Sequence, residues 1–114
     1  MTLGEKQRLF TRLIGKLIEY AYNTGYELTF GDAYRSPEQA KLNAAAGKGI
    51  VNSLHCERLA IDLNLFRNGK YLTDSADYKL LGEYWESLGP DCAWGGRFSK
   101  PDGNHFSIRH AGRA

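Results

Sequence analysis

The segment 59–66 constrains the fold more strongly than any other part of this 114-residue chain. Its residues alternate between two faces, one with Leu59, Ile61, Leu63 and Leu65 and the other with Ala60, Asp62, Asn64 and Phe66. Because successive side chains of a strand point to opposite faces, this period of two predicts a half-buried strand. Asn68 and Gly69 follow as the strongest short signal for a tight hairpin turn, and residues 71–72 begin the returning strand. We therefore expect an antiparallel sheet with one face packed on a core.

Two longer helices are expected to cover that face of the sheet. Apolar side chains recur at helical spacing over residues 4–23, and again over residues 73–88, where Thr73 or Asp74 would cap the helix. Mixed helices and hairpin-linked strands indicate an α+β fold, with a small, mainly antiparallel sheet and helices packed on it.

Shorter elements fill the remaining sequence. Ser36 followed by Pro37 predicts the start of a helix that ends near Ala46, with a loop over residues 48–51 behind it. Extended segments are predicted at residues 26–30, at 92–98 with Gly95-Gly96 as a bend, and at 105–108.

Length and composition limit the classes of protein to consider. A chain of this size forms one small domain, and no apolar run approaches the ~18 residues of a membrane span. The first residues lack the pattern of a signal peptide, so we expect synthesis in the cytoplasm. A net charge of +2 with scattered basic side chains does not favour nucleic acid as a partner. Cys56 and Cys92 are expected to be free thiols, although their oxidation state is not determined by the sequence.

His55, Asp62 and His105 are the strongest candidates for a reactive centre. Two imidazoles and one carboxylate can bind zinc and leave a coordination position for water. Asp62 lies in a strongly apolar segment, where a carboxylate needs a partner that a metal would provide. Asp102 lies three residues before His105, where a carboxylate can act as general base toward such a water.

The same residues have ordinary structural roles as alternatives. His55 could be a surface loop residue, Asp62 a buried hydrogen-bond acceptor and His105 a cap, and spacing alone does not decide against these roles. Asp102 belongs to a Pro-Asp-Gly-Asn sequence that is typical of a turn. Arg35 could be a surface salt-bridge partner.

Short motifs within residues 26–108 resemble, in order, those of the zinc peptidases that cleave peptidoglycan stem peptides. They are Tyr34-Arg35-Ser36 with Gln39, Ser53-x-His55 with Asp62, Trp94-Gly95-Gly96-x-Phe98, and Asp102-x-x-His105-Phe106. That family includes D-alanyl-D-alanine carboxypeptidases and phage and bacterial L-alanyl-D-glutamate endopeptidases, and the resemblance implies its hedgehog-like fold. The sequence differs from the family pattern at one place. Many members carry Gly between the first His and the Ala-x-Asp segment, where this chain has Arg58 and Leu59.

The resemblance implies a role for each of these residues. One zinc ion per chain would be bound by His55, Asp62 and His105. Asp102 takes the place of the catalytic acid or base. Arg35 takes the place of the arginine that stabilises the developing oxyanion, a role that suits the fixed donors of a guanidinium.

Substrate contacts are implied for a second group of residues. Ser53 would hydrogen-bond the substrate, Gln39 would brace Arg35 or line the cleft, and Trp94 would shape the cleft wall. Alternatively, Trp94 could simply be a core residue.

The function that the resemblance implies is hydrolysis of a peptide bond in peptidoglycan stem peptides. The short chain and Asp102 favour an L-alanyl-D-glutamate endopeptidase of the phage or prophage endolysin type. The alternatives are a D-alanyl-D-alanine carboxypeptidase and a non-catalytic zinc-containing module that binds wall or protein. A metal nuclease is disfavoured because the chain has no basic patch.

The expected organisation follows from the same resemblance. Residues 1–114 would form a single catalytic domain without a separate wall-binding domain, acting as a monomer. The stem peptide would be its partner. An enzyme made in the cytoplasm would reach the wall through a holin or by delivery with a virion.

Overall fold

The computed structural model describes residues 1–49 and 52–114. The helices are α1 (Leu3–Asn23), α2 (Pro37–Ala45) and α3 (Lys79–Ser87). The strands are β1 (Glu27–Phe30), β2 (Ala60–Arg67), β3 (Lys70–Leu72), β4 (Cys92–Trp94) and β5 (His105–Ile108), with short 3-10 turns η1 (Leu54–Glu57), η2 (Ser75–Tyr78) and η3 (Gly95–Arg97). Helices combined with an antiparallel sheet confirm the predicted α+β class. In the described part of the chain, no helix has the length and hydropathy needed to cross a membrane.

Strand β2 is the centre of the sheet. One of its edges pairs antiparallel with β1, while successive stretches of the other edge pair antiparallel with β5 and β3. Strand β4 pairs with β5 and completes the order β1-β2-β5-β4. Asn68 and Gly69, at φ of 52° and 76°, form the predicted tight turn between β2 and β3.

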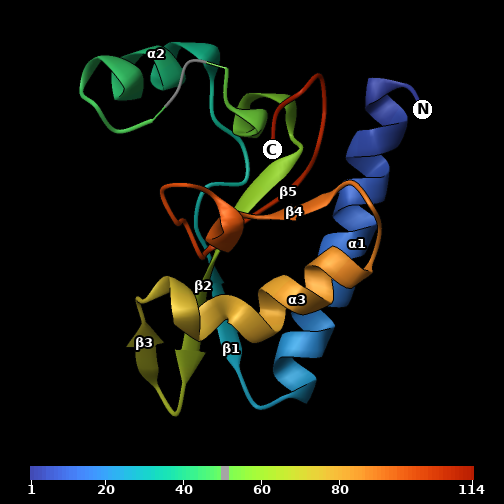
Figure 1. Ribbon diagram of the computed structural model, residues 1–114, viewed down its shortest axis with the longest axis vertical. Helices are drawn as coiled ribbons and strands as arrows, with labels where there is room; N and C mark the ends of the chain where they lie inside the picture. Colours follow the sequence, from blue (N-terminus) through green and yellow to red (C-terminus); the bar gives the residue numbers. More distant parts are fainter. Residues whose placement is uncertain (50–51) are drawn as a thin grey trace.

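Helices α1 and α3 cross each other and pack on the sheet (Figure 1). Tyr20 of α1 stacks on Tyr84 of α3, and the ring of Phe10 meets Trp85 edge-on. Trp85 in turn meets Phe106 of β5, so the two helices and the sheet share one aromatic core. The side chains that β2 contributes to the core are Ala60, Ile61, Leu63 and Leu65. Each large apolar side chain buried in this way contributes about 1.5–3 kcal/mol.

Helix α2 stands apart from this core, at the opposite end of the molecule from β3 (Figure 1). The Ser36 hydroxyl accepts a hydrogen bond from the Gln39 N–H at 3.1 Å, and Pro37 is the first helical residue, as predicted. Among the described residues of α2 only Ala40 is buried, and Leu42 is 65% exposed. The loop predicted over residues 48–51 includes 50–51, which lie outside the described residues.

The third helix begins later than its sequence pattern predicts. Ser75–Tyr78 forms the turn η2, and α3 starts only at Lys79, so neither Thr73 nor Asp74 caps it. Tyr78 accounts for the difference, because its hydroxyl donates to the Leu72 carbonyl and accepts from the Leu65 N–H beneath the hairpin. In the segment 92–98 the strand ends at Trp94 and the chain turns at Gly95, where a bend was predicted, but residues 95–97 form the 3-10 turn η3 instead of a further extended stretch.

Candidate metal centre and catalytic cleft

Asp62 and His105 face each other because of the register of the sheet. They are direct partners across the β2–β5 ladder, beside the pair formed by Ile61 and Phe106. Cross-strand partners share a face of the sheet. With Ile61 and Phe106 buried in the core, Asp62 and His105 lie on the other face, where their side chains are 20% and 8% exposed.

His55 reaches the same point from the turn η1. The Ser53 hydroxyl accepts a hydrogen bond from the His55 N–H at 3.2 Å, and Leu54 anchors the turn in the core. Arg58 ends the turn with φ of 56°, in the left-handed region that glycine adopts without steric cost. Its guanidinium lies 4.0 Å over the ring of Tyr34. Arg58, which stands where many members of the family carry glycine, thus adopts the left-handed conformation that glycine favours.

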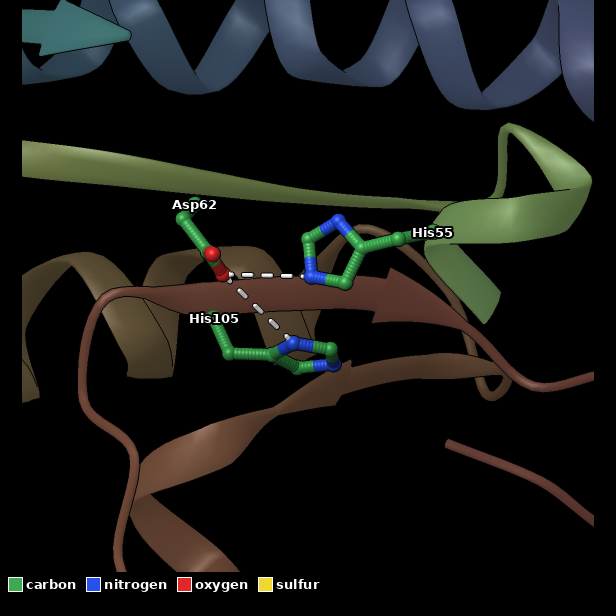
Figure 2. A group of neighbouring side chains, drawn as sticks. All are labelled: His55, Asp62 and His105. Atoms are coloured by element: carbon green, nitrogen blue, oxygen red, sulfur yellow. Dashed lines mark ion pairs between the residues drawn. The ribbon is translucent and has the colours of Figure 1, made fainter. Parts of the chain in front are cut away.

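The three side chains gather around one point (Figure 2). Asp62 Oδ1 lies 3.4 Å from His55 Nε2 and 3.7 Å from His105 Nδ1. This Oδ1 atom is buried and makes no hydrogen bond within residues 1–49 and 52–114. Zinc bonds of about 2.0–2.1 Å in a tetrahedron place ligand atoms about 3.3–3.4 Å apart, whereas hydrogen bonds are about 2.7–3.2 Å long. The two distances from Asp62 Oδ1 are closer to the spacing of ligands around a shared zinc ion than to the length of a hydrogen bond.

The charge state of Asp62 is compatible with a metal ligand. Burial acts to raise the pKa of Asp62, but the adjoining imidazoles of His105 and His55 outweigh it and lower that pKa to about 2. The carboxylate is therefore ionised at neutral pH, as metal binding requires. His55 is only 4% exposed, which excludes the alternative of a surface loop residue, and His105 lies within a strand.

Packing orients the two imidazoles. His55 Nδ1 and His105 Nε2, which point away from Asp62, are buried and make no hydrogen bond to any described residue. The His105 ring instead contacts Phe98 at a centroid distance of 5.2 Å and meets the His55 ring edge-on at 5.4 Å. Metal-binding histidines usually donate this second nitrogen to a carboxylate or carbonyl, so this cluster relies on aromatic contacts for its orientation.

Asp102 is held beside the cluster by a tight turn. Its carbonyl accepts a hydrogen bond from the His105 N–H at 3.1 Å, and its own N–H donates to the Gly95 carbonyl at 2.9 Å. A Cβ at position 95 would overlap the Asp102 carbonyl and lie 2.8 Å from His105 Cβ, so this close approach requires glycine.

The Asp102 side chain reaches solvent through the cleft, yet its pKa is raised. Partial burial of the carboxyl is the main cause of the raised pKa, and the charge of Asp62 adds to it, while His105, His55 and Arg35 act in the opposite direction. A carboxyl whose pKa is raised toward the working pH is suited to accept a proton and return it.

Arg35 enters the cleft from the segment between β1 and α2. Its N–H donates to the His55 carbonyl at 3.2 Å, and its guanidinium binds Asp32 Oδ2 through Nη2 at 2.9 Å and Nε at 3.3 Å. The Asp32 carbonyl accepts a hydrogen bond from the Asp62 N–H at 2.9 Å. Arg35 therefore forms a salt bridge, the structural role that the sequence left open for it. Because the backbone of its partner Asp32 is hydrogen-bonded to Asp62, the salt bridge also fixes the guanidinium relative to the cluster.

A cleft of about 390 Å³ brings most of the predicted site residues together. The predicted residues that line it are His55, Asp62, His105, Asp102, Arg35 and Ser53. Gln39 and Trp94 are not part of its lining. Gln39 is exposed on α2, where its amide donates to Asn43 at 2.7 Å instead of bracing Arg35. Trp94 is 4% exposed, and its indole N–H donates to the Gly103 carbonyl at 2.7 Å, so it supports the Asp102 turn from the core.

Sequence reasoning missed two lysines that line the cleft. Lys48 follows α2, and Lys100 precedes Asp102 in the loop after η3. Exposed charged residues in loops follow no periodic pattern that would indicate a role. The one indication in the sequence was that Lys100 lies two residues before Asp102.

Comparison with known proteins gives a match to a family model and matches to solved structures. The family model described as D-alanyl-D-alanine carboxypeptidase matches residues 46–108, a span that includes the cluster and Asp102 but not Arg35. The crystal structure of the Serratia marcescens L-Ala D-Glu endopeptidase ChiX matches with a TM-score of 0.74 at 20% sequence identity, covering 93% of this chain and 85% of that chain. At this identity the likeness shows a common fold. No significant match was found among curated proteins.

Proposed function

The chain belongs to the family described as D-alanyl-D-alanine carboxypeptidase, and from that premise we propose that it is a zinc peptidase of peptidoglycan stem peptides that cleaves the L-Ala–D-Glu bond. The observation that carries the proposal is one cleft holding a His-Asp-His cluster, Asp102 and Arg35. A module that only binds wall or protein needs neither a carboxyl with a raised pKa nor a fixed guanidinium beside the cluster. The arrangement therefore favours catalysis over binding alone.

The residues of the cluster fit zinc. His55, Asp62 and His105 would hold it, because Asp62 Oδ1 lies 3.4 and 3.7 Å from a ring nitrogen of each histidine and is a buried oxygen without a hydrogen bond among the described residues. Bound there, zinc supplies a Lewis acid and lowers the pKa of a coordinated water.

Asp102 and Arg35 supply the remaining chemistry. The Asp102 carboxylate accepts the proton of the attacking water and then returns it to the leaving amine, the two roles of a single general base and acid. The Arg35 guanidinium donates to the carbonyl oxygen as negative charge develops on it, and its ion pair with Asp32 holds it in place. Ser53, whose hydroxyl caps η1, fixes the position of His55 while lining the cleft.

The shape of the cleft favours an endopeptidase. A second groove of about 200 Å³ also has Pro101 and Asp102 in its lining, so the two hollows adjoin at Asp102. An endopeptidase holds chain on both sides of the bond it cuts, whereas a carboxypeptidase accommodates a single residue on the leaving side. The fold shared with an enzyme named as an L-Ala D-Glu endopeptidase agrees with this choice. We propose the phage or prophage endolysin type, acting on the wall after release or delivery.

A D-alanyl-D-alanine carboxypeptidase is the second candidate, because that activity gives the matching family model its description. Both activities need the same cluster, the same Asp102 and the same Arg35. Their products separate them: an endopeptidase leaves a new amino-terminal D-Glu, and a carboxypeptidase releases free D-Ala.

Digestion of purified peptidoglycan tests the proposal. The zinc-loaded protein is incubated with wall fragments with and without a chelator, and mass spectrometry identifies the products. We expect chelator-sensitive release of peptides with amino-terminal D-Glu. Free D-Ala would establish the carboxypeptidase, and absence of any chelator-sensitive product would favour a binding module.

The matched control is Asp102→Asn. This variant should retain zinc in elemental analysis and lose about 10²–10⁴-fold in turnover, the usual contribution of a general acid or base. Undiminished turnover would remove Asp102 from the mechanism.

A further inference from the structure

Two lysines in the cleft have no part in the chemistry described above. Lys48 and Lys100 line the same hollow as the cluster and Arg35. Both are exposed, and within residues 1–49 and 52–114 neither has a carboxylate at ion-pairing distance. Of the two acidic side chains of this lining, Asp62 is engaged with two histidines and Asp102 lies where the cleft meets the second groove. Whereas Arg35 is paired with Asp32, Lys48 and Lys100 are therefore the cations of this lining that can offer positive charge to a ligand.

The groove beyond Asp102 has a different character. Apart from Asp102, its lining is uncharged and rich in hydroxyl and amide groups, and we call it the hydroxyl groove: Tyr71, Thr73, Ser75, Tyr78 and Asn104 with Pro101 and Gly103. The polar groups of Ser75, Tyr78 and Asn104 are engaged in hydrogen bonds within the protein. The hydroxyls of Tyr71 and Thr73 make none with any described residue, and both residues are exposed.

The stem peptide has a matching asymmetry about the L-Ala–D-Glu bond. On the leaving side, D-Glu continues the stem through its side-chain carboxyl, so its α-carboxylate is free and anionic. On the other side, L-Ala is joined by an uncharged amide to the muramic acid of the glycan. A negative group thus lies on one side of the bond, and neutral hydrogen-bonding groups lie on the other.

We propose that this asymmetry sets the direction in which the substrate binds. Lys48 and Lys100 bind the free carboxylate of D-Glu, and the hydroxyl groove, through Tyr71 and Thr73, binds the muramyl side. The inference deepens the proposed function and rests on it. Lysine suits this task because its ammonium is a point charge on a flexible stem, which can follow a carboxylate without a fixed fork geometry.

The first experiment pairs enzyme variants with charge variants of the substrate. Kinetics are measured for Lys48→Gln, Lys100→Gln and the exposed control Lys16→Gln on α1, using stem peptides with D-Glu or with its α-amide, D-isoglutamine. The kcat/KM of the wild type should be about tenfold higher for the acid than for the amide, mainly through a lower KM. The amide cannot form the two partly solvated ion pairs, each of which increases affinity by up to about fivefold. Each cleft variant should reduce that preference about threefold.

A binding measurement separates recognition from turnover. Calorimetric titration of both peptides into Asp102→Asn, loaded with zinc, should show the same preference for the acid and the same loss of preference when Lys48→Gln or Lys100→Gln is added. Lys16→Gln should leave the preference unchanged. Equal affinity for the two peptides, or a preference that survives both cleft variants, would overturn the assignment of the lysines.

The direction of binding has its own test. Thr73→Val should weaken cleavage of a muramyl peptide relative to the same peptide without the sugar, about threefold for one hydrogen bond, and leave the acid-to-amide preference unchanged. A change in the acid-to-amide preference instead would mean that the substrate runs the other way. If the wild type cleaves the D-Glu and D-isoglutamine peptides equally well, only the assignment of the lysines is wrong. If it cleaves no wall peptide, the proposed function itself is wrong.

Discussion

The two walls of the cleft are held in place in different ways. On one side, the β2–β5 ladder carries Asp62 and His105 as direct partners, with Ile61 and Phe106 buried behind them. Their relative position is set by backbone pairing and by core packing, and neither can shift alone without breaking strand hydrogen bonds. We call this side the ladder wall.

Residues 31–49, which we call the arm, contribute Arg35, Lys48 and Gly49 to the lining of the cleft. The position of Arg35 depends on one backbone hydrogen bond to His55 and an ion pair with Asp32. Of the arm's helix α2, among the described residues, only Ala40 is buried. Under the proposed function, metal binding would depend on the ladder wall together with His55, and turnover would also need Arg35 of the arm, so we expect that the two properties can be damaged separately.

The largest effect is expected from the ladder wall. His105→Ala removes a zinc ligand, and the bound metal should fall from one ion per chain to a trace after dialysis, with loss of all wall hydrolysis. The increase in Tm on adding zinc should disappear with it, because a ligand that no longer binds the native state cannot stabilise it.

His110→Ala is the control for that experiment. His110 lies outside the cluster, where it contacts Lys6 and Glu57, and its removal should leave zinc content unchanged. Normal metal content in His105→Ala would mean that the cluster does not use this histidine.

The arm should show the reverse behaviour. Arg35→Met is expected to lower kcat/KM by about 10²–10³-fold, as loss of a donor to a developing oxyanion does, while zinc content and Tm change little. Arg35→Lys should recover only part of the activity, because it restores the charge without the fork of donors. An exposed arginine of α1 gives the control, Arg12→Met, with unchanged kinetics. Loss of zinc from Arg35→Met would show that the arm also holds the metal site together.

The stability of the ladder wall should depend on pH through Asp62. In metal-free protein the folded-state pKa of Asp62 is about 2, below its ordinary value of 3.8. A depressed carboxyl pKa stabilises the fold above the unfolded pKa, and this contribution is lost as pH falls from about 4 to about 2. At about 1.4 kcal/mol per pH unit, Asp62 contributes about 2 kcal/mol at pH 5.

Urea unfolding of chelated protein at several pH values measures this contribution. Asp62→Asn should lower the free energy of unfolding at pH 5 by about that amount and flatten its dependence on pH between about 4 and 2. An equal slope in both proteins would assign the acid sensitivity to other carboxyls.

The ladder wall is also the part that sequence could predict. The alternation of residues 59–66 and the start of a strand at His105 were enough to orient Asp62 and to place both elements. Pairing of His105 with Asp62 could not be read from periodicity, because register depends on contacts between distant segments. The ion pair that holds Arg35 and the two cleft lysines depend on loop geometry, which leaves no pattern in the sequence.

The smallest effect is expected at Gln39, and it tests how far the arm moves. Its side chain is exposed on α2 and bound to Asn43, outside the cleft lining. Gln39→Ala should therefore change kcat/KM less than about twofold and the free energy of unfolding by less than about 0.5 kcal/mol, as for an ordinary surface site. If turnover fell about tenfold with unchanged zinc content, α2 would have to rotate toward the substrate during catalysis, since a residue so loosely packed has no other route to the reaction. Substrate-dependent quenching of a fluorophore attached at Leu42, which is 65% exposed on the same helix, would then report that movement directly.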